Sequence, residues 1–124
     1  MKYNEINDES IDKLMKNFYA KIRGHKDLGP IFNGAVGTDD ESWERHIEKI
    51  GKFWKTMLLG EKLYMGNPVL PHINLLPFDI KLFDVWLGLF KESLDELFEE
   101  KAANYYLEVA NNIAINFKAV LFNQ

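Results

Sequence analysis

The chain has 124 residues, of which 47% are hydrophobic and 14% aromatic, and it carries a formal net charge of −4. This length and composition predict one domain, residues 1–124, with ample material for a core. The basic residues are scattered, which argues against binding of nucleic acid or of an anionic membrane surface. There is no cysteine, so disulfides and thiolate-ligated metals are excluded.

The first ten residues, MKYNEINDES, are polar and acidic and contain no apolar signal region. No apolar run approaches the roughly 18 residues of a membrane-spanning helix. We therefore expect a cytoplasmic protein that does not enter the membrane.

The first helix is predicted to begin with Asp8 as its N-cap and to end at Gly24. Helical spacing places these apolar residues on one face, with Tyr19 beside them: Ile11, Leu14, Met15, Phe18 and Ile22. The polar residues 25–27 are expected to be exposed. The chain then turns and directs Phe32 inward, and residues 33–37 are predicted to form a loop.

The second long helix is predicted to start with a capping box, in which Thr38 and Glu41 satisfy each other's backbone N–H groups. It runs to about Leu59 and stops at Gly60. Its apolar residues are Trp43, Ile47, Ile50, Phe53, Trp54 and Met57. His46 lies on the same face, where a lone histidine is commonly a hydrogen-bonded core residue rather than a ligand.

Glycines and prolines are dense in residues 60–77, which leaves room for a helical turn but not for a long helix. His72 lies in this segment. Pro77 suits the first position of the next helix, which is expected to run to about Phe98. Its inward residues are Leu82, Phe83, Trp86, Leu89, Phe90, Ser93, Leu94 and Leu97. Residues 99–101 break the pattern, and a last helix carries Ala102, Tyr106, Val109, Ala110, Ile113, Phe117, Val120 and Leu121. The pattern predicts an all-α fold with four substantial helices.

The histidines limit the metal chemistry that is available. A di-iron helical bundle needs Glu-x-x-His pairs, but Trp43 and Val69 stand three residues before His46 and His72. A zinc site needs three or four suitable ligands, which two usable histidines on different elements do not supply. A haem site needs one imidazole, an apolar slot and a few polar groups over the open iron face. The sequence contains all three.

The residues that carry a family resemblance extend through nearly the whole chain. They are Phe18-Tyr19, Leu28-Gly29-Pro30-Ile31-Phe32, Trp43 with His46, Ile50-Gly51-Lys52-Phe53-Trp54, Met57-Leu58-Leu59-Gly60, His72 with Leu76-Pro77-Phe78, and Trp86-Leu87 with Leu89-Phe90. In these the chain resembles the truncated haemoglobins, the short two-on-two variant of the globin fold. The absence of a Gly-Gly pair favours the third group of that family.

The resemblance implies a truncated two-on-two globin fold around a non-covalent haem b. It implies that His72 is the proximal iron ligand and that Tyr19, His46 and Trp86 lie on the distal, catalytic side. Further implied cofactor contacts are Phe32, Ile50, Phe53, Trp54, Phe78 and Trp86. The implied partners of the propionates are Arg45, Lys49 and Lys52, for which an ordinary solvated face is the alternative.

These roles predict a protein that holds its ligand. Dioxygen bound at the iron carries partial negative charge, and two donors at about 1.5–3 kcal/mol each would slow its release by roughly two to four orders of magnitude. We therefore expect handling of dioxygen, nitric oxide, carbon monoxide or peroxide rather than bulk oxygen transport. Nitric-oxide dioxygenation would need a separate reductase, and in peroxidase-like chemistry His46 would serve as the distal base, or it would gate the pocket. The alternative is a cofactor-free helical interaction module. A monomer is expected.

Overall fold

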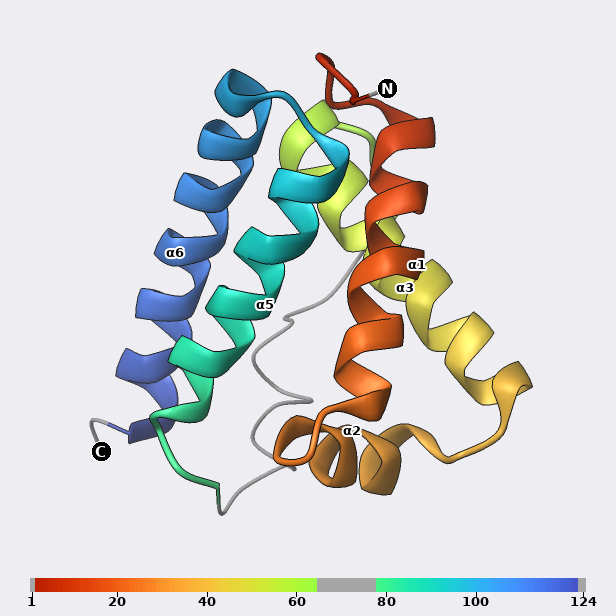
Figure 1. The fold of residues 1–124 in the computed structure, drawn as a ribbon, viewed down its shortest axis with the longest axis vertical. Coiled ribbons are helices and arrows are strands. Elements are labelled where there is room, and N and C mark those ends of the chain that lie inside the picture. The colour runs from red at the N-terminus through yellow and green to blue at the C-terminus, as the bar shows by residue number, and fades with distance from the viewer. Residues whose placement is uncertain (1, 65–77, 123–124) are drawn as a thin grey trace.

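The computed structural model describes residues 2–64 and 78–122, and all of its regular elements are helices (Figure 1). The helices are α1 (Asp8–Gly24), α2 (Leu28–Val36), α3 (Asp40–Leu59), α5 (Leu82–Leu97) and α6 (Glu100–Phe122). The only strand-like feature in the described residues is an isolated bridge between Tyr3 and Phe98. The predicted all-α class is therefore confirmed for the described part of the chain.

The N-cap of α1 is Asn7, so the prediction of Asp8 was wrong by one residue. Asn7 Oδ1 accepts a hydrogen bond from the backbone N–H of Ser10 at 2.9 Å, and Ser10 Oγ accepts one from the backbone N–H of Asn7 at 2.9 Å. This reciprocal pair needs a polar side chain three residues after the cap. Asp8 is followed at that distance by Ile11, so the cap falls on Asn7 instead.

Helix α2 extends to Val36, so the prediction of a loop at residues 33–37 was wrong for residues 33–36 and right only for Gly37. The helix is started by a residue outside it: the His25 Nδ1 accepts hydrogen bonds from the backbone N–H groups of Asp27 and Leu28 at 3.1 and 3.2 Å. His25 is accordingly half-buried rather than exposed. The histidine satisfies N–H groups that a helix leaves unpaired at its start.

Gly29 lies where α2 approaches the last turn of α1. A Cβ at this position would lie 2.8 Å from the Arg23 carbonyl oxygen. We expect Gly29→Ala to lower the free energy of unfolding by about 1–3 kcal/mol, as overpacking does. Gly34→Ala is the matched control in the same helix, because nothing lies within 4 Å of the added Cβ. Urea denaturation measures both, and equal midpoints would contradict this close approach.

Helix α3 is capped by Asp39, whose carboxylate accepts a hydrogen bond from the backbone N–H of Ser42 at 2.9 Å. The predicted cap, Thr38, was therefore wrong by one residue. A charged acceptor suits a helix N-terminus better than a hydroxyl. That hydrogen bond also lowers the pKa of Asp39. The predicted stop is confirmed, since Gly60 follows the helix in the left-handed conformation, with φ 73°.

Helix α5 begins at Leu82, later than predicted, and Pro77 lies outside the described residues. A turn precedes it, in which Asp79 Oδ1 accepts from the backbone N–H of Lys81 at 2.9 Å. Two residues expected to face inward are exposed, Met57 at 51% and Val120 at 46%. Each lies in the last turn of its helix.

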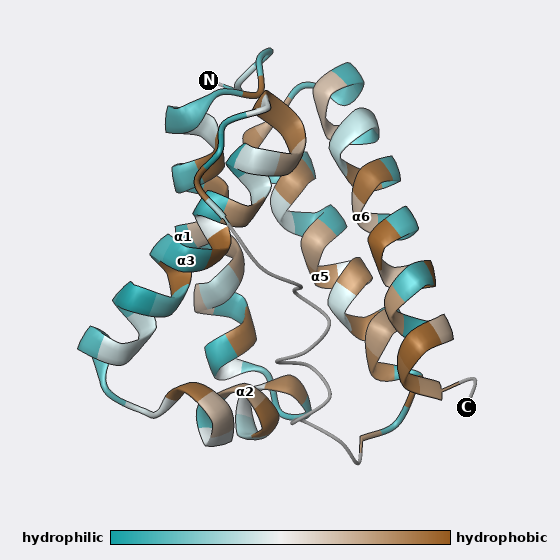
Figure 2. Ribbon diagram, turned by 180° about the vertical axis from the view of Figure 1, so that it is seen from behind, coloured by the Kyte–Doolittle hydropathy of each residue, from teal (hydrophilic) through white to brown (hydrophobic). Residues whose placement is uncertain are grey.

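The helices form two neighbouring pairs, α1 with α3 and α5 with α6, and α1 also packs against α5 and α2 (Figure 1). Figure 2 shows hydrophobic and hydrophilic residues alternating around the longer helices. The predicted apolar face of α1 is confirmed: Ile11, Leu14, Phe18 and Ile22 are all 0% exposed. The core continues through Trp54, Phe90 and Tyr106 from the other helices.

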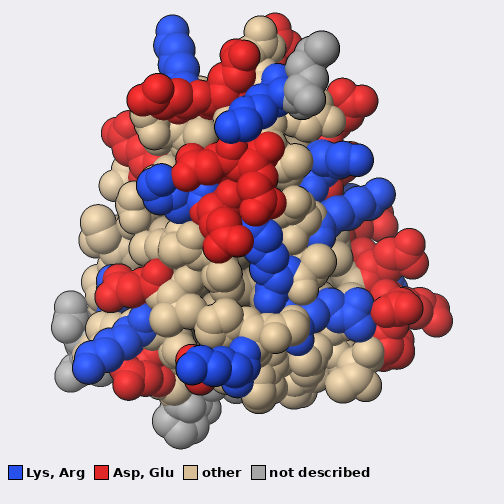
Figure 3. Space-filling model, in the orientation of Figure 1, with Lys and Arg blue, Asp and Glu red and all other residues tan. Residues whose placement is uncertain are grey.

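Polar contacts connect elements that are distant in sequence. The Lys21 ammonium lies 3.2 Å from the Glu92 carboxylate and 2.8 Å from that of Glu96, which ties α1 to α5. Figure 3 shows acidic and basic side chains intermingled on one face of the molecule. Tyr3 exchanges backbone hydrogen bonds with Leu97 and Glu99, each of 2.8 Å, at the turn between α5 and α6. None of the described helices is long and apolar enough to cross a membrane.

Candidate functional site

A cavity of about 210 Å³ lies among the five described helices. Its described lining is mostly aromatic and aliphatic and consists of Tyr19, Leu28, Ile31, Phe32, His46, Lys49, Ile50, Phe53, Trp54, Tyr64, Phe78, Leu82, Phe83, Trp86, Ala110, Ile113, Ala114 and Phe117. An apolar cavity with a few polar groups is the usual form of a small-molecule or cofactor site.

The three residues predicted for the distal side all line this cavity. Tyr19 comes from α1, His46 from α3 and Trp86 from α5. The Tyr19 and His46 rings are nearly perpendicular, with centroids 5.6 Å apart. Trp86 stacks on Phe90, with centroids 5.0 Å apart and an interplanar angle of 9°. The structure therefore brings together three ring side chains that lie far apart in the sequence.

Tyr19 is the most enclosed of these three residues, with 4% of its surface exposed. Burial raises the pKa of its phenol well above the ordinary value, because the apolar surroundings disfavour the phenolate. The hydroxyl therefore keeps its proton across the physiological pH range and acts as a hydrogen-bond donor. The phenol oxygen can also accept a hydrogen bond, whereas the indole N–H of Trp86 is only a donor. These two groups are suited to a ligand that carries partial negative charge.

The apolar contacts predicted for the cofactor also lie in the lining, namely Phe32, Ile50, Phe53, Trp54 and Phe78. Trp54 is 3% exposed and stacks on Phe90 with an interplanar angle of 21°. His72, predicted to be the metal ligand, lies outside the described residues. Within residues 2–64 and 78–122, no group of three or more His, Cys, Asp or Glu side chains could hold a metal ion.

The structure separates the three cations that were predicted to act together. Lys49 lines the cavity, whereas Arg45 and Lys52 are not among the described lining residues. Arg45 pairs with Glu41 at 2.9 Å, and Lys52 pairs with Glu48 at 3.5 Å, both along the outer face of α3. Lys49 is thus the one permanently charged side chain in the described lining.

Several residues of the lining were not predicted to contact the cofactor, among them Leu28 and Ile31 of α2, Leu82 and Phe83 of α5, four residues of α6, and Tyr64. Residues Ala110, Ile113, Ala114 and Phe117 form one face of α6. Helical spacing had placed Ala110, Ile113 and Phe117 on the apolar face of this helix, but spacing alone does not distinguish a core face from a cavity wall. The two alanines leave space that larger side chains would fill. Tyr64 is different, because its position depends on Thr56, whose Oγ1 accepts from the backbone N–H of Leu63 and of Tyr64 at 3.2 and 3.0 Å. No local sequence pattern predicts that contact.

Comparison with known proteins gives one family. No family model matches the chain. The chain is 51% identical over 122 residues to the group 3 truncated haemoglobin ctb of Campylobacter jejuni, covering 98% of this chain and 96% of that protein. It also superimposes on the crystal structure of the group III truncated haemoglobin from Campylobacter jejuni with a TM-score of 0.96, at 51% identity and the same coverage. The predicted two-on-two globin fold is confirmed, and the chain belongs to the group 3 truncated haemoglobins.

Proposed function

We propose that the chain binds haem b non-covalently in this cavity and holds a diatomic ligand there. The observation that carries the proposal is a set of three polar rings, those of Tyr19, His46 and Trp86, in the wall of an otherwise mainly apolar cavity. The similar protein from Campylobacter jejuni is a truncated haemoglobin, which supports the choice of cofactor. The proposed iron ligand is His72, at the position that the family resemblance implies.

The described lining fits a large, flat and mostly apolar group. Aromatic side chains, among them Phe32 and Phe53, supply broad apolar surfaces, and Ala110 and Ala114 leave room beside them. The acidic edge of such a group would meet Lys49. The chain has no cysteine, so a thioether attachment is excluded, which is consistent with the proposed non-covalent binding.

Haem, when bound, supplies an iron that takes up diatomic gases and exchanges single electrons. The residues of the chain decide how long a ligand stays. Tyr19 and Trp86 would donate hydrogen bonds to a ligand that carries partial negative charge, each worth about 1.5–3 kcal/mol. The raised pKa of the Tyr19 phenol keeps this donor protonated at neutral pH.

We propose that this retention serves redox handling of dioxygen and nitric oxide rather than bulk oxygen transport. A dioxygen that is released slowly remains available for a second reactant that enters the same cavity. One nitric oxide, one dioxygen and one electron balance as one nitrate ion. The electron is proposed to come from a separate reductase.

An absorption spectrum tests the cofactor and its ligand together. The purified protein, reduced with dithionite, is expected to show a Soret band that shifts when carbon monoxide is added. His72→Gly is expected to lose this band and to regain it with added imidazole, because imidazole replaces the missing side chain. His25→Asn is the control, since it removes a histidine outside the cavity but keeps a side chain that accepts hydrogen bonds at the start of α2.

Two results would count against the proposal. A colourless protein that takes up no added haemin would exclude haem binding and leave the cofactor-free module. An unchanged spectrum in His72→Gly would show that another residue ligates the iron.

A further inference from the structure

Trp43 lies directly behind two of the polar rings in the cavity wall. It is 1% exposed, and its ring centroid lies 5.5 Å from that of His46 and 6.1 Å from that of Tyr19. The His46 ring is nearly perpendicular to both neighbours, with interplanar angles of 86° to Trp43 and 89° to Tyr19. The described lining of the cavity includes Tyr19 and His46 but not Trp43. Trp43 therefore supports these two rings from outside the cavity.

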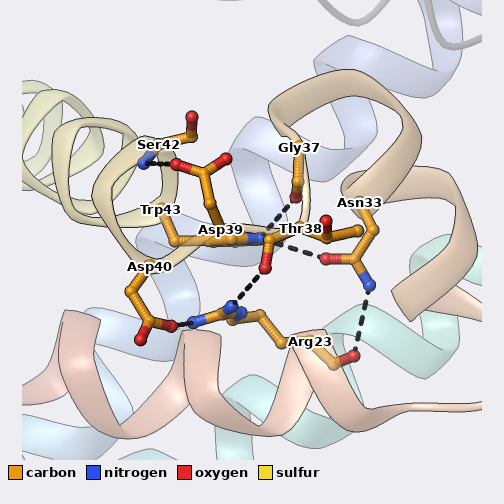
Figure 4. Close-up of polar contacts among 8 residues, drawn as sticks. All are labelled: Arg23, Asn33, Gly37, Thr38, Asp39, Asp40, Ser42 and Trp43. Atoms are coloured by element: carbon orange, nitrogen blue, oxygen red, sulfur yellow. Dashed lines mark hydrogen bonds and ion pairs between the residues drawn. The ribbon is translucent and has the colours of Figure 1, made fainter.

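The plane of the Trp43 ring is held by two hydrogen bonds. Its Nε1–H donates to Asn33 Oδ1 at 3.0 Å and to the Gly37 carbonyl oxygen at 2.9 Å (Figure 4). Both acceptors belong to the end of α2 or to the residue that follows it. Gly37 has φ 113°, a conformation that other residues rarely adopt, so the backbone at this acceptor is specific to glycine.

Arg23 holds the same ring from the end of α1. Its guanidinium carbon lies 5.2 Å from the Trp43 ring centroid, in cation–π geometry. The guanidinium also donates to the Thr38 carbonyl oxygen at 3.1 Å and pairs with the Asp40 carboxylate at 3.1 Å. Asn33 Nδ2 donates in turn to the Arg23 carbonyl oxygen at 3.5 Å. Contacts from α1, from α2 and from Gly37 therefore fix an indole ring that belongs to α3.

We infer that Trp43 is a positioning residue, which holds Tyr19 and His46 in their orientation toward the cavity and is itself held by Arg23, Asn33 and Gly37. An apolar residue of the same size would fill this space, but its ring could turn. The indole cannot turn without breaking both of its hydrogen bonds. The effect of this positioning on ligand entry rests on the proposed function, whereas the orientation of the rings does not.

The experiment compares Asn33→Ala with Asn33→Asp. Alanine removes the side-chain acceptor of the Trp43 N–H, and aspartate keeps an acceptor oxygen. Neither change alters an aromatic ring. In proton NMR spectra of the purified protein, with carbon monoxide on the ferrous haem where haem is present, we expect the cross-peak between the Tyr19 and His46 ring protons to weaken in Asn33→Ala and to persist in Asn33→Asp.

The rate of carbon monoxide association is the second readout. In Asn33→Ala it is expected to change by about two- to tenfold, the range that one neutral hydrogen bond supports. Trp43→Phe, which removes both hydrogen bonds, is expected to show the same changes in cross-peak and rate. It replaces Asn33→Ala in the experiment if Asn33→Ala does not fold. Asn17→Ala is the control, because its partner is Glu96 at 3.3 Å, on α5.

An unchanged cross-peak and an unchanged rate in Asn33→Ala and Trp43→Phe would overturn the inference. If the cross-peak weakened in Asn33→Asp as much as in Asn33→Ala, the inference would also be overturned, because the acceptor oxygen would then be irrelevant. A wild-type protein that binds no haem would defeat the proposed function alone. The cross-peak of the bare chain would still decide the role of Trp43.

Discussion

Dioxygen is expected to dissociate about 10- to 150-fold faster from Tyr19→Phe than from the wild type, which corresponds to the loss of one hydrogen bond to a charged group. The substitution removes only the hydroxyl. The ring keeps its place, because its neighbours Phe18 and Trp43, with centroids at 4.9 and 6.1 Å, contact the aromatic part. The change therefore isolates the donor from the packing of the wall.

Stopped-flow mixing of the oxygenated protein with carbon monoxide measures this rate. Tyr105→Phe removes a hydroxyl from a tyrosine that is 54% exposed on α6, outside the described lining of the cavity, and is expected to leave the rate unchanged. A wild-type rate as fast as that of an oxygen-storage protein would contradict the proposed retention. An unchanged rate in Tyr19→Phe would show that the phenol does not contact the ligand.

Phe18→Ala is expected to lower the free energy of unfolding by about 3–5 kcal/mol. Phe18 is 0% exposed and stands behind the cavity wall. Its ring packs edge-on against Tyr19, Trp86 and Phe90, with centroids 4.9, 5.1 and 5.0 Å apart. Alanine leaves a void among three rings that belong to two helices, so the neighbours cannot all close in.

Urea denaturation followed by circular dichroism measures the loss. Ile115→Ala is the control, because Ile115 is 61% exposed on α6 and its truncation should change stability by less than about 0.5 kcal/mol. Similar midpoints for the two variants would mean that the rings around Phe18 repack readily. That result would also argue against a cavity wall that is rigid before a ligand binds.

The inward faces of the long helices were predictable because one physical quantity, the helical period, determines them. Phe18 and Ile22 repeat at the spacing of one turn, and burial of that face is the main gain that α1 makes on folding. The end of α2 was not predictable in this way. Asn33 and Gly34 carry no apolar period, and the contacts at this end come from another helix, since the Trp43 Nε1–H donates to Asn33 Oδ1 and to the Gly37 carbonyl oxygen.

The residues of the cavity, too, were predictable only in part. The polar rings at Tyr19, His46 and Trp86, which line the cavity, were identified from the family resemblance, because their helical faces alone indicate only ordinary core residues. Sequence could not rank Lys49 above Arg45, since both lie at the border between the inner and outer faces of α3. Local ion pairing decides the outcome: Arg45 has Glu41 one turn before it and pairs with it on the outer face.

The backbone bridge of Tyr3 with Leu97 and Glu99 has a consequence for the order of folding. The backbone hydrogen bonds inside a helix join residues four apart, but this bridge joins residue 3 to residues 97 and 99. The entropy cost of closing a loop grows with its length, so such a contact becomes favourable only after the intervening helices have collapsed. We therefore expect the bridge to form late in folding, after α1 has packed close to the corner between α5 and α6.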